Sequence, residues 1–134
     1  MPRPQKQKQQ QDLGMRLEQL KSLFTQIQQE IEHLSSRGDL APSGAWIVRY
    51  QARGRGGVYW YYKWQSHEPI FVTKEGKKSC HKYIGKAGSP AYLKAVEMLV
   101  RRTKIEGLEQ ALHTLELGLS DLVEEATRHH KDSD

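Results

Sequence analysis

Cysteine and long apolar runs are what this 134-residue chain lacks most. Its single cysteine, Cys80, excludes an intramolecular disulfide and a zinc site built from several cysteines. No stretch approaches the roughly 18 apolar residues of a membrane helix, and the N-terminus lacks the apolar core of a secretory signal. We therefore expect a cytoplasmic protein that makes no contact with membranes.

Acidic residues are scarce in one part of the chain, although the net charge is only +5. Residues 44–104 carry thirteen Lys or Arg residues and three acidic residues. Residues 105–134 carry two Lys or Arg residues and eight acidic residues. Ten of the eleven aromatic residues also lie within 44–104. Interleaved cations and aromatic rings are typical of a nucleic-acid surface. The alternative is a solvated basic surface around a small aromatic core.

The same scarcity of acids argues against catalysis. Three carboxylates in the basic segment are too few for a two-metal nuclease centre, and no nucleophile with its base can be assigned from position. The neighbours Cys80 and His81 should point to opposite faces of a strand, so they cannot chelate a metal together. We expect no enzyme, no catalytic residue, no metal and no cofactor.

Two segments show the apolar spacing of paired helices. In residues 12–36, with Asp12 as a possible N-cap, the apolar positions are Leu13, Leu17, Leu20, Phe24, Ile27, Ile31 and Leu34. In the acidic residues 105–128 they are Leu108, Leu112, Leu115, Leu119 and Leu122. Such narrow stripes need a helical partner. The Leu13–Leu34 and Leu108–Leu122 seams predict pairing within one chain or across a homodimer.

Between these segments the sequence predicts a small sheet followed by a helix. Residues 46–53 and 58–65 alternate as strands around a glycine turn, and residues 70–73 and 79–84 are shorter strand candidates. Ser89-Pro90 is a helix start, and Gly107 should interrupt or bend that helix. The predicted fold class is α+β: a small three- to four-stranded antiparallel sheet packed on a helix, flanked by long N- and C-terminal coiled-coil-like helices. The predicted organisation is a disordered tail 1–11, a heptad helix 12–36, a linker 37–45, a nucleic-acid-binding module 46–104, an acidic helix 105–128 and a tail 129–134.

Strand alternation suggests which side chains form the binding face. We expect Trp46, Val48 and Tyr50 to match Val58, Trp60, Tyr62 and Trp64 and to pack on the helix. The predicted nucleic-acid-binding residues, on the opposite face and in the glycine turn, are Arg49, Gln51, Arg53, Arg55, Tyr59, Tyr61, Lys63, Lys78 and Lys82. Arginine can grip guanine, glutamine can read adenine, and lysine and tyrosine can hold phosphates.

These features lead to one hypothesis and two alternatives. The first is a nucleic-acid-binding accessory or regulatory factor that holds duplex DNA, because a β-ribbon fits the major groove. The second is binding of single-stranded or structured RNA by stacking on Tyr59 and Tyr61. The third is a non-enzymatic assembly subunit whose heptad helices pair with a partner while the basic sheet docks an acidic one.

One stretch also resembles a known family. Residues 46–50 (WIVRY), 59–64 (YWYYKW) and 81–86 (HKYIGK), which precede the Ser89-Pro90 helix start, are similar to the AP2/integrase arm-type DNA-binding domains. Short proteins found near mobile elements share that build. The resemblance implies a three-stranded sheet plus a helix that binds DNA, and it covers less than half of the chain. Residues 66–76 depart from the pattern.

Overall fold

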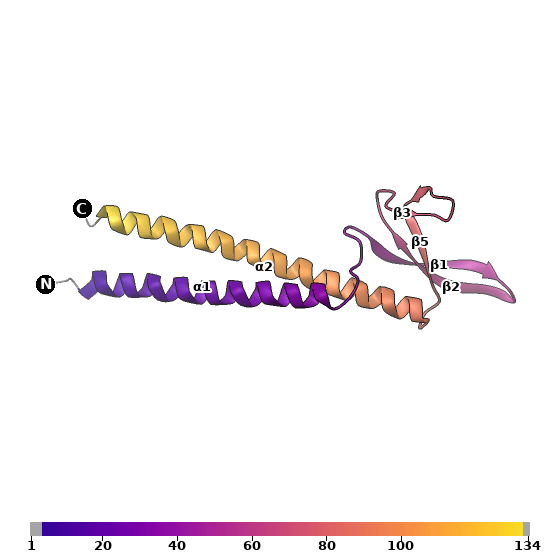
Figure 1. Cartoon of the computed structure of the whole chain (residues 1–134), viewed down its shortest axis with the longest axis horizontal. Coiled ribbons are helices and arrows are strands. Elements are labelled where there is room, and N and C mark those ends of the chain that lie inside the picture. The colour runs from indigo at the N-terminus through magenta and orange to yellow at the C-terminus, as the bar shows by residue number, and fades with distance from the viewer. Residues whose placement is uncertain (1–3, 133–134) are drawn as a thin grey trace. The chain divides into compact units, whose positions relative to one another are not determined.

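The computed structural model describes residues 4–132, and it confirms an α+β fold with two helices and a small antiparallel sheet (Figure 1). The chain divides into two compact units. We call Met1–Ser36 with Ile105–Asp134 the helical unit, and Arg37–Lys104 the sheet unit. Across residues 4–132, no helix combines the length and the apolar character needed to cross a membrane.

The helical unit pairs α1 (Pro4–Ser36) with the part of α2 (Pro90–Asp132) that begins at Ile105. The two helices lie side by side in Figure 1. All seven apolar positions of the first seam are at least partly buried, and a Cβ built on Gly118 would lie 3.4 Å from Leu20 Cδ1. Arg16 also forms an ion pair with Glu125. The two seams therefore meet within one chain.

Several local expectations for the helices were wrong. Helix α1 begins at Pro4 and not at Asp12, so residues 4–11 are helical where a disordered tail was predicted, while residues 1–3 lie outside the described part. Asp12 is no N-cap but pairs with Arg16 at 3.0 Å, one turn further along the helix. Helix α2 runs without interruption through Gly107 and on to Asp132, so most of the predicted tail 129–134 is helical. The second seam also differs from the prediction, because the Leu119 side chain is exposed and Gly118, which is not a predicted seam position, faces α1.

The sheet unit contains one three-stranded antiparallel sheet in the order β1-β2-β5. Strands β1 (Trp46–Gly54) and β2 (Gly57–Gln65) form the predicted hairpin, and β5 (His81–Gly85) pairs with β2. The hairpin turn needs glycine, because Gly56 has a φ of 87° in the left-handed region. Strands β3 (Phe71–Val72) and β4 (Lys78–Ser79) form a separate two-stranded sheet.

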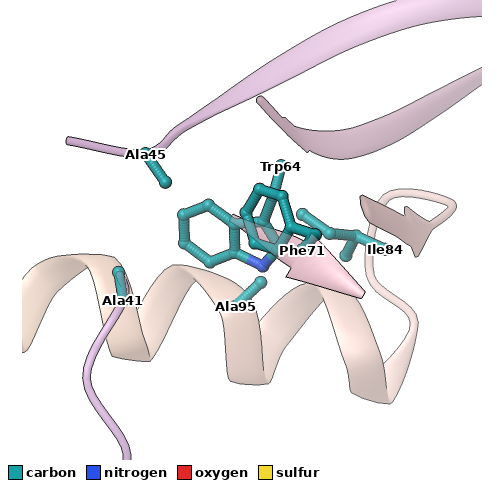
Figure 2. Close-up of a cluster of buried hydrophobic side chains, with 6 residues drawn as sticks. All are labelled: Ala41, Ala45, Trp64, Phe71, Ile84 and Ala95. Atoms are coloured by element: carbon teal, nitrogen blue, oxygen red, sulfur yellow. The ribbon is translucent and has the colours of Figure 1, made fainter. Parts of the chain in front are cut away.

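The core of the sheet unit is built around Trp64, which is only 5% exposed. Figure 2 shows its indole between the sheet and α2, with Phe71 and Ile84 beside it and Ala95 of α2 beneath. The predicted helix start is confirmed: Pro90 is the first helical residue, and the Ser89 Oγ accepts a hydrogen bond from the Tyr92 amide at 3.2 Å.

The linker before β1 is fixed to the first turns of α2. Arg101 donates two hydrogen bonds to the Asp39 carbonyl, at 2.6 and 3.2 Å, and Arg102 donates to the Pro42 carbonyl. Lys94 lies 3.6 Å from the Asp39 carboxylate. Part of the positive charge of the basic segment is therefore engaged in contacts within the fold.

Candidate nucleic-acid interface

The register of the β1–β2 hairpin decides which side chains share a face. Gly54 pairs with Gly57, so Arg49 lies opposite Tyr62 and Tyr50 lies opposite Tyr61. Directly paired residues point to the same side of a sheet. One side, here called the helix-side face, packs on α2 and consists of Ile47, Arg49, Gln51, Arg53, Val58, Trp60, Tyr62, Trp64, Lys82 and Ile84. The other, here called the open face, consists of Trp46, Val48, Tyr50, Ala52, Tyr59, Tyr61, Lys63, Gln65, His81 and Tyr83.

The expected basic face was therefore wrong. Arg49, Gln51 and Arg53 do not lie beside Tyr61 and Lys63 but on the opposite side of the sheet. The predicted packing face was half right. Of the β2 residues that it named, Tyr62 and Trp64 reach the core, whereas Val58 and Trp60 are exposed. The neighbour of Tyr62 and Trp64 from β1 in the core is Ile47, not the aromatic residues of that strand.

A row of tyrosines crosses the open face, one from each strand. Tyr50 of β1 lies 6.1 Å from Tyr61 of β2, and Tyr61 lies 6.2 Å from Tyr83 of β5, measured between ring centroids. The angles between the ring planes are 34° and 51°. Tyr83 is 62% exposed, whereas Tyr50 and Tyr61 are half-buried. We call these three residues the tyrosine row.

Two lysines lie over rings on this face. The Lys63 Nζ is 4.9 Å from the centroid of Tyr50, and the Lys86 Nζ is 4.5 Å from that of Tyr59 and 5.7 Å from that of Tyr61. Burial, followed by the charges of Tyr83 and Tyr61, raises the pKa of Tyr50 above its ordinary value of 10.0. The Tyr50 phenol is neutral at physiological pH with or without this shift, so it does not repel an anion.

Of the two arginines of the helix-side face, Arg49 lies near the middle of β1 and Arg53 lies at its turn end. That end extends past the first turn of α2 in Figure 1. The Arg49 guanidinium stacks on Trp60, 3.9 Å from the ring centroid, and Trp60 is 46% exposed. Arg53 is exposed. In the turn itself, the Arg55 carbonyl accepts a hydrogen bond from the Tyr59 hydroxyl at 2.7 Å.

Two predicted site residues, Lys78 and Lys82, lie away from both the tyrosine row and the arginines of the hairpin. Lys78 belongs to β4 of the two-stranded sheet, opposite Val72. Lys82 lies opposite Trp64 and lines a hollow of about 250 Å³ that also includes Lys94 of α2. The structure therefore does not gather the nine predicted residues into one site.

The positive charge on the sheet has no acidic partner. Within the described part of the chain, no ion pair involves a Lys or Arg of residues 44–88. That stretch contains nine cations and two acidic residues. Unpaired cations beside half-exposed rings form an anion-attracting surface. Among the side chains of residues 7–128, no group of His, Cys, Asp and Glu is arranged to hold a metal ion.

Sequence reasoning missed three residues of the open face. Tyr50 was assigned to the core because its strand neighbours are apolar, and Tyr83 was assigned no face. Lys86 was not among the predicted site residues, although it follows β5 directly and reaches back over two rings. The pairing register contains the missing information, and alternation within one strand cannot supply it.

Comparison with known proteins identifies no relative of this chain. The chain matches no protein-family model, no curated protein and no solved structure.

Proposed function

We propose that this protein binds nucleic acid through the open face of its three-stranded sheet. The observation that carries the proposal is the tyrosine row with Lys63 and Lys86 over its rings. Aromatic rings offer stacking surfaces, and lysines attract the phosphate backbone. Packing in a hydrophobic core would account for buried aromatic residues, but it does not account for Tyr83, whose side chain is largely exposed.

Two matched double variants test the proposal, because each removes two positive charges from one face. The double variant Lys63→Ala with Lys86→Ala removes the two lysines beside the rings of the open face. The double variant Arg49→Ala with Arg53→Ala removes the two arginines of the helix-side face. Binding of a 30-nucleotide single strand and of its duplex is measured by fluorescence anisotropy over a salt series. Circular dichroism confirms that each variant is folded.

We expect the lysine variant to bind more weakly and to show a shallower salt dependence. Each lost phosphate contact removes about 0.7 from the log–log slope on single strands and about 0.9 on duplex. The arginine variant should keep most of its affinity. If only the arginine variant loses binding, the open face is the wrong face. If both variants bind as tightly as the parent, the protein does not bind nucleic acid by either face.

Duplex DNA bound by the hairpin end is the second candidate. It is favoured by one observation: the cations of the turn region, Arg53 and Arg55, lie at the end of a two-stranded ribbon that extends past α2. A ribbon of this kind can enter a major groove. Against it, the guanidinium of Arg49 is already stacked on Trp60. Tighter binding of the duplex, lost in the arginine variant, would favour this candidate.

The helical unit suggests a coiled-coil-like role in assembly as a further proposal. The seams already meet within the chain, so a second copy or a partner helix has only the remaining apolar side chains to contact. Exposed examples on these helices are Leu23, Leu117 and Val123. Sedimentation of the purified protein over a concentration range would show a dimer if these side chains pair. A monomer at all concentrations would contradict this proposal.

A further inference from the structure

The spacing of the tyrosine row identifies the form of nucleic acid that fits the open face. Neighbouring ring centroids are 6.1 and 6.2 Å apart. Bases stacked in a duplex rise by only about 3.4 Å per nucleotide along each strand. Consecutive bases can therefore rest on consecutive rings of the row only if the strand is stretched to nearly twice that rise.

A duplex cannot meet this requirement. Its bases cover one another's faces, and it presents base edges and phosphates to a protein. The tyrosine row offers ring faces, so it needs bases that are unstacked and unpaired. The hydroxyl groups of the row are also poor readers of base edges compared with Arg, Asn or Gln, which carry several directed donors.

The row also fixes the path of the strand. Tyr50, Tyr61 and Tyr83 belong to β1, β2 and β5, which are neighbours in this order. A nucleic-acid strand that uses all three rings must cross the sheet from β1 to β5. Lys63 lies over the first ring, and Lys86 lies near the second. Both cations are thus placed to contact phosphates beside the stacked bases.

We propose that the tyrosine row is a three-base site for an unpaired, stretched nucleic-acid strand that crosses β1, β2 and β5 with one base on each ring and little sequence preference. This inference rests on the proposed function, and it adds the ligand's form and its path. Single-stranded DNA and RNA share the chemistry that the row recognises, so both are included in the test.

The test uses the full chain, three single-stranded hexamers of equal charge, and a six-base-pair duplex that carries about twice that charge because it has two backbones. Binding of oligo-dT, of oligo-U, of an abasic sugar–phosphate strand and of a six-base-pair duplex is compared by competition against a labelled single strand. The abasic strand keeps every phosphate and removes every base. We expect either single strand to bind at least tenfold more tightly than the abasic strand and the duplex.

Variants of the exposed ring identify the stacking contact. Tyr83→Leu should lower the affinity for oligo-dT by about five- to 150-fold, which corresponds to a stacking contribution of roughly 1–3 kcal/mol per base. Tyr83→Phe keeps the ring and should restore binding. Trp60→Leu removes an exposed aromatic ring from the opposite face, and it should leave affinity unchanged.

The possible failures are distinguishable. If the abasic strand binds as well as oligo-dT, and Tyr83→Leu has no effect while Lys63→Ala with Lys86→Ala weakens binding, the three-base site is wrong but nucleic-acid binding stands. Tighter binding of the duplex would likewise overturn the unpaired strand as the ligand. If none of the four ligands competes, the proposed function fails as well.

Discussion

The approach of α1 to α2 at Gly118 allows the helix pairing to be tested by substitution. A Cβ at this position would make ordinary van der Waals contact with Leu20 Cδ1, at 3.4 Å. Gly107 lies in the same helix and has nothing within 4 Å of its own added Cβ. Replacing either glycine with alanine should stabilise the protein by about 0.5–1 kcal/mol, because glycine loses more backbone entropy in a helix.

Leucine at the two positions separates packing from helix propensity. Leucine is nearly as good a helix former as alanine. Gly107→Leu should therefore keep most of the stability gained by Gly107→Ala, because nothing lies close to an added Cβ at this position. Gly118→Leu must displace the Leu20 side chain, and overpacking of this kind costs about 1–3 kcal/mol. We therefore expect Gly118→Leu to have a lower free energy of unfolding than Gly107→Leu by about 1–3 kcal/mol. Urea unfolding followed by far-UV circular dichroism measures this difference.

Equal unfolding free energies for the two leucine variants would refute the reasoning. In that case Leu20 does not lie against Gly118, and the apolar seam of α1 must face something else. Sedimentation of the parent protein would then show whether a second copy covers that seam. The two alanine variants serve as controls, since both should be stabilised whether or not the helices meet at this point.

Three further predictions concern other parts of the fold. Ser89→Ala removes the cap of α2 and should lower the free energy of unfolding by about 0.5–2 kcal/mol, whereas Ser89→Asp should restore it, as urea unfolding would show. The pKa of Tyr50 is raised mainly by burial, so its contribution to stability is complete below the unfolded pKa and is lost as the pH rises through the folded one. An ultraviolet titration should show that Tyr50→Phe removes a phenol that ionises above pH 10.0, and loss of a phenol that ionises at or below pH 10.0 would contradict the shift. The Arg16–Glu125 pair is partly solvent-exposed, so a double-mutant cycle should give a coupling energy below about 1 kcal/mol, and a larger value would indicate a desolvated pair.

Elements with strong local signals were predictable from the sequence. The start of α2 follows from Ser89 and Pro90, whose side chains favour a helix start regardless of tertiary contacts. The β1–β2 hairpin follows from β-branched and aromatic residues on both sides of a glycine turn. The start of α1 was missed, because a Lys- and Gln-rich segment without apolar residues carries no periodic signal, although both residue types tolerate a helix well.

The faces of the sheet were not predictable, because alternation gives two faces for each strand but does not say which faces match. The prediction placed aromatic residues of both strands on one side. With Gly54 closing on Gly57 around a two-residue turn, even-numbered residues of β1 pair instead with odd-numbered residues of β2. A shift of one residue moves every side chain to the other face. Burial of Trp64 and Ile47 in the same core fits the observed register. Arg49 and Arg53 lie on the same face of β1 as Ile47.

The lysines over the tyrosine rings raise the question of whether a base could still stack there. A cation over an exposed aromatic ring contributes about 0.5–1 kcal/mol, whereas a base stacked on a ring contributes roughly 1–3 kcal/mol. A base should therefore displace the ammonium groups of Lys63 and Lys86 from the ring faces. The displaced ammonium groups remain on flexible side chains beside the same rings, where the phosphates of a bound strand would lie. Stacking and charge neutralisation then reinforce each other. In the absence of a ligand, the lysines shield ring surfaces that would otherwise face water.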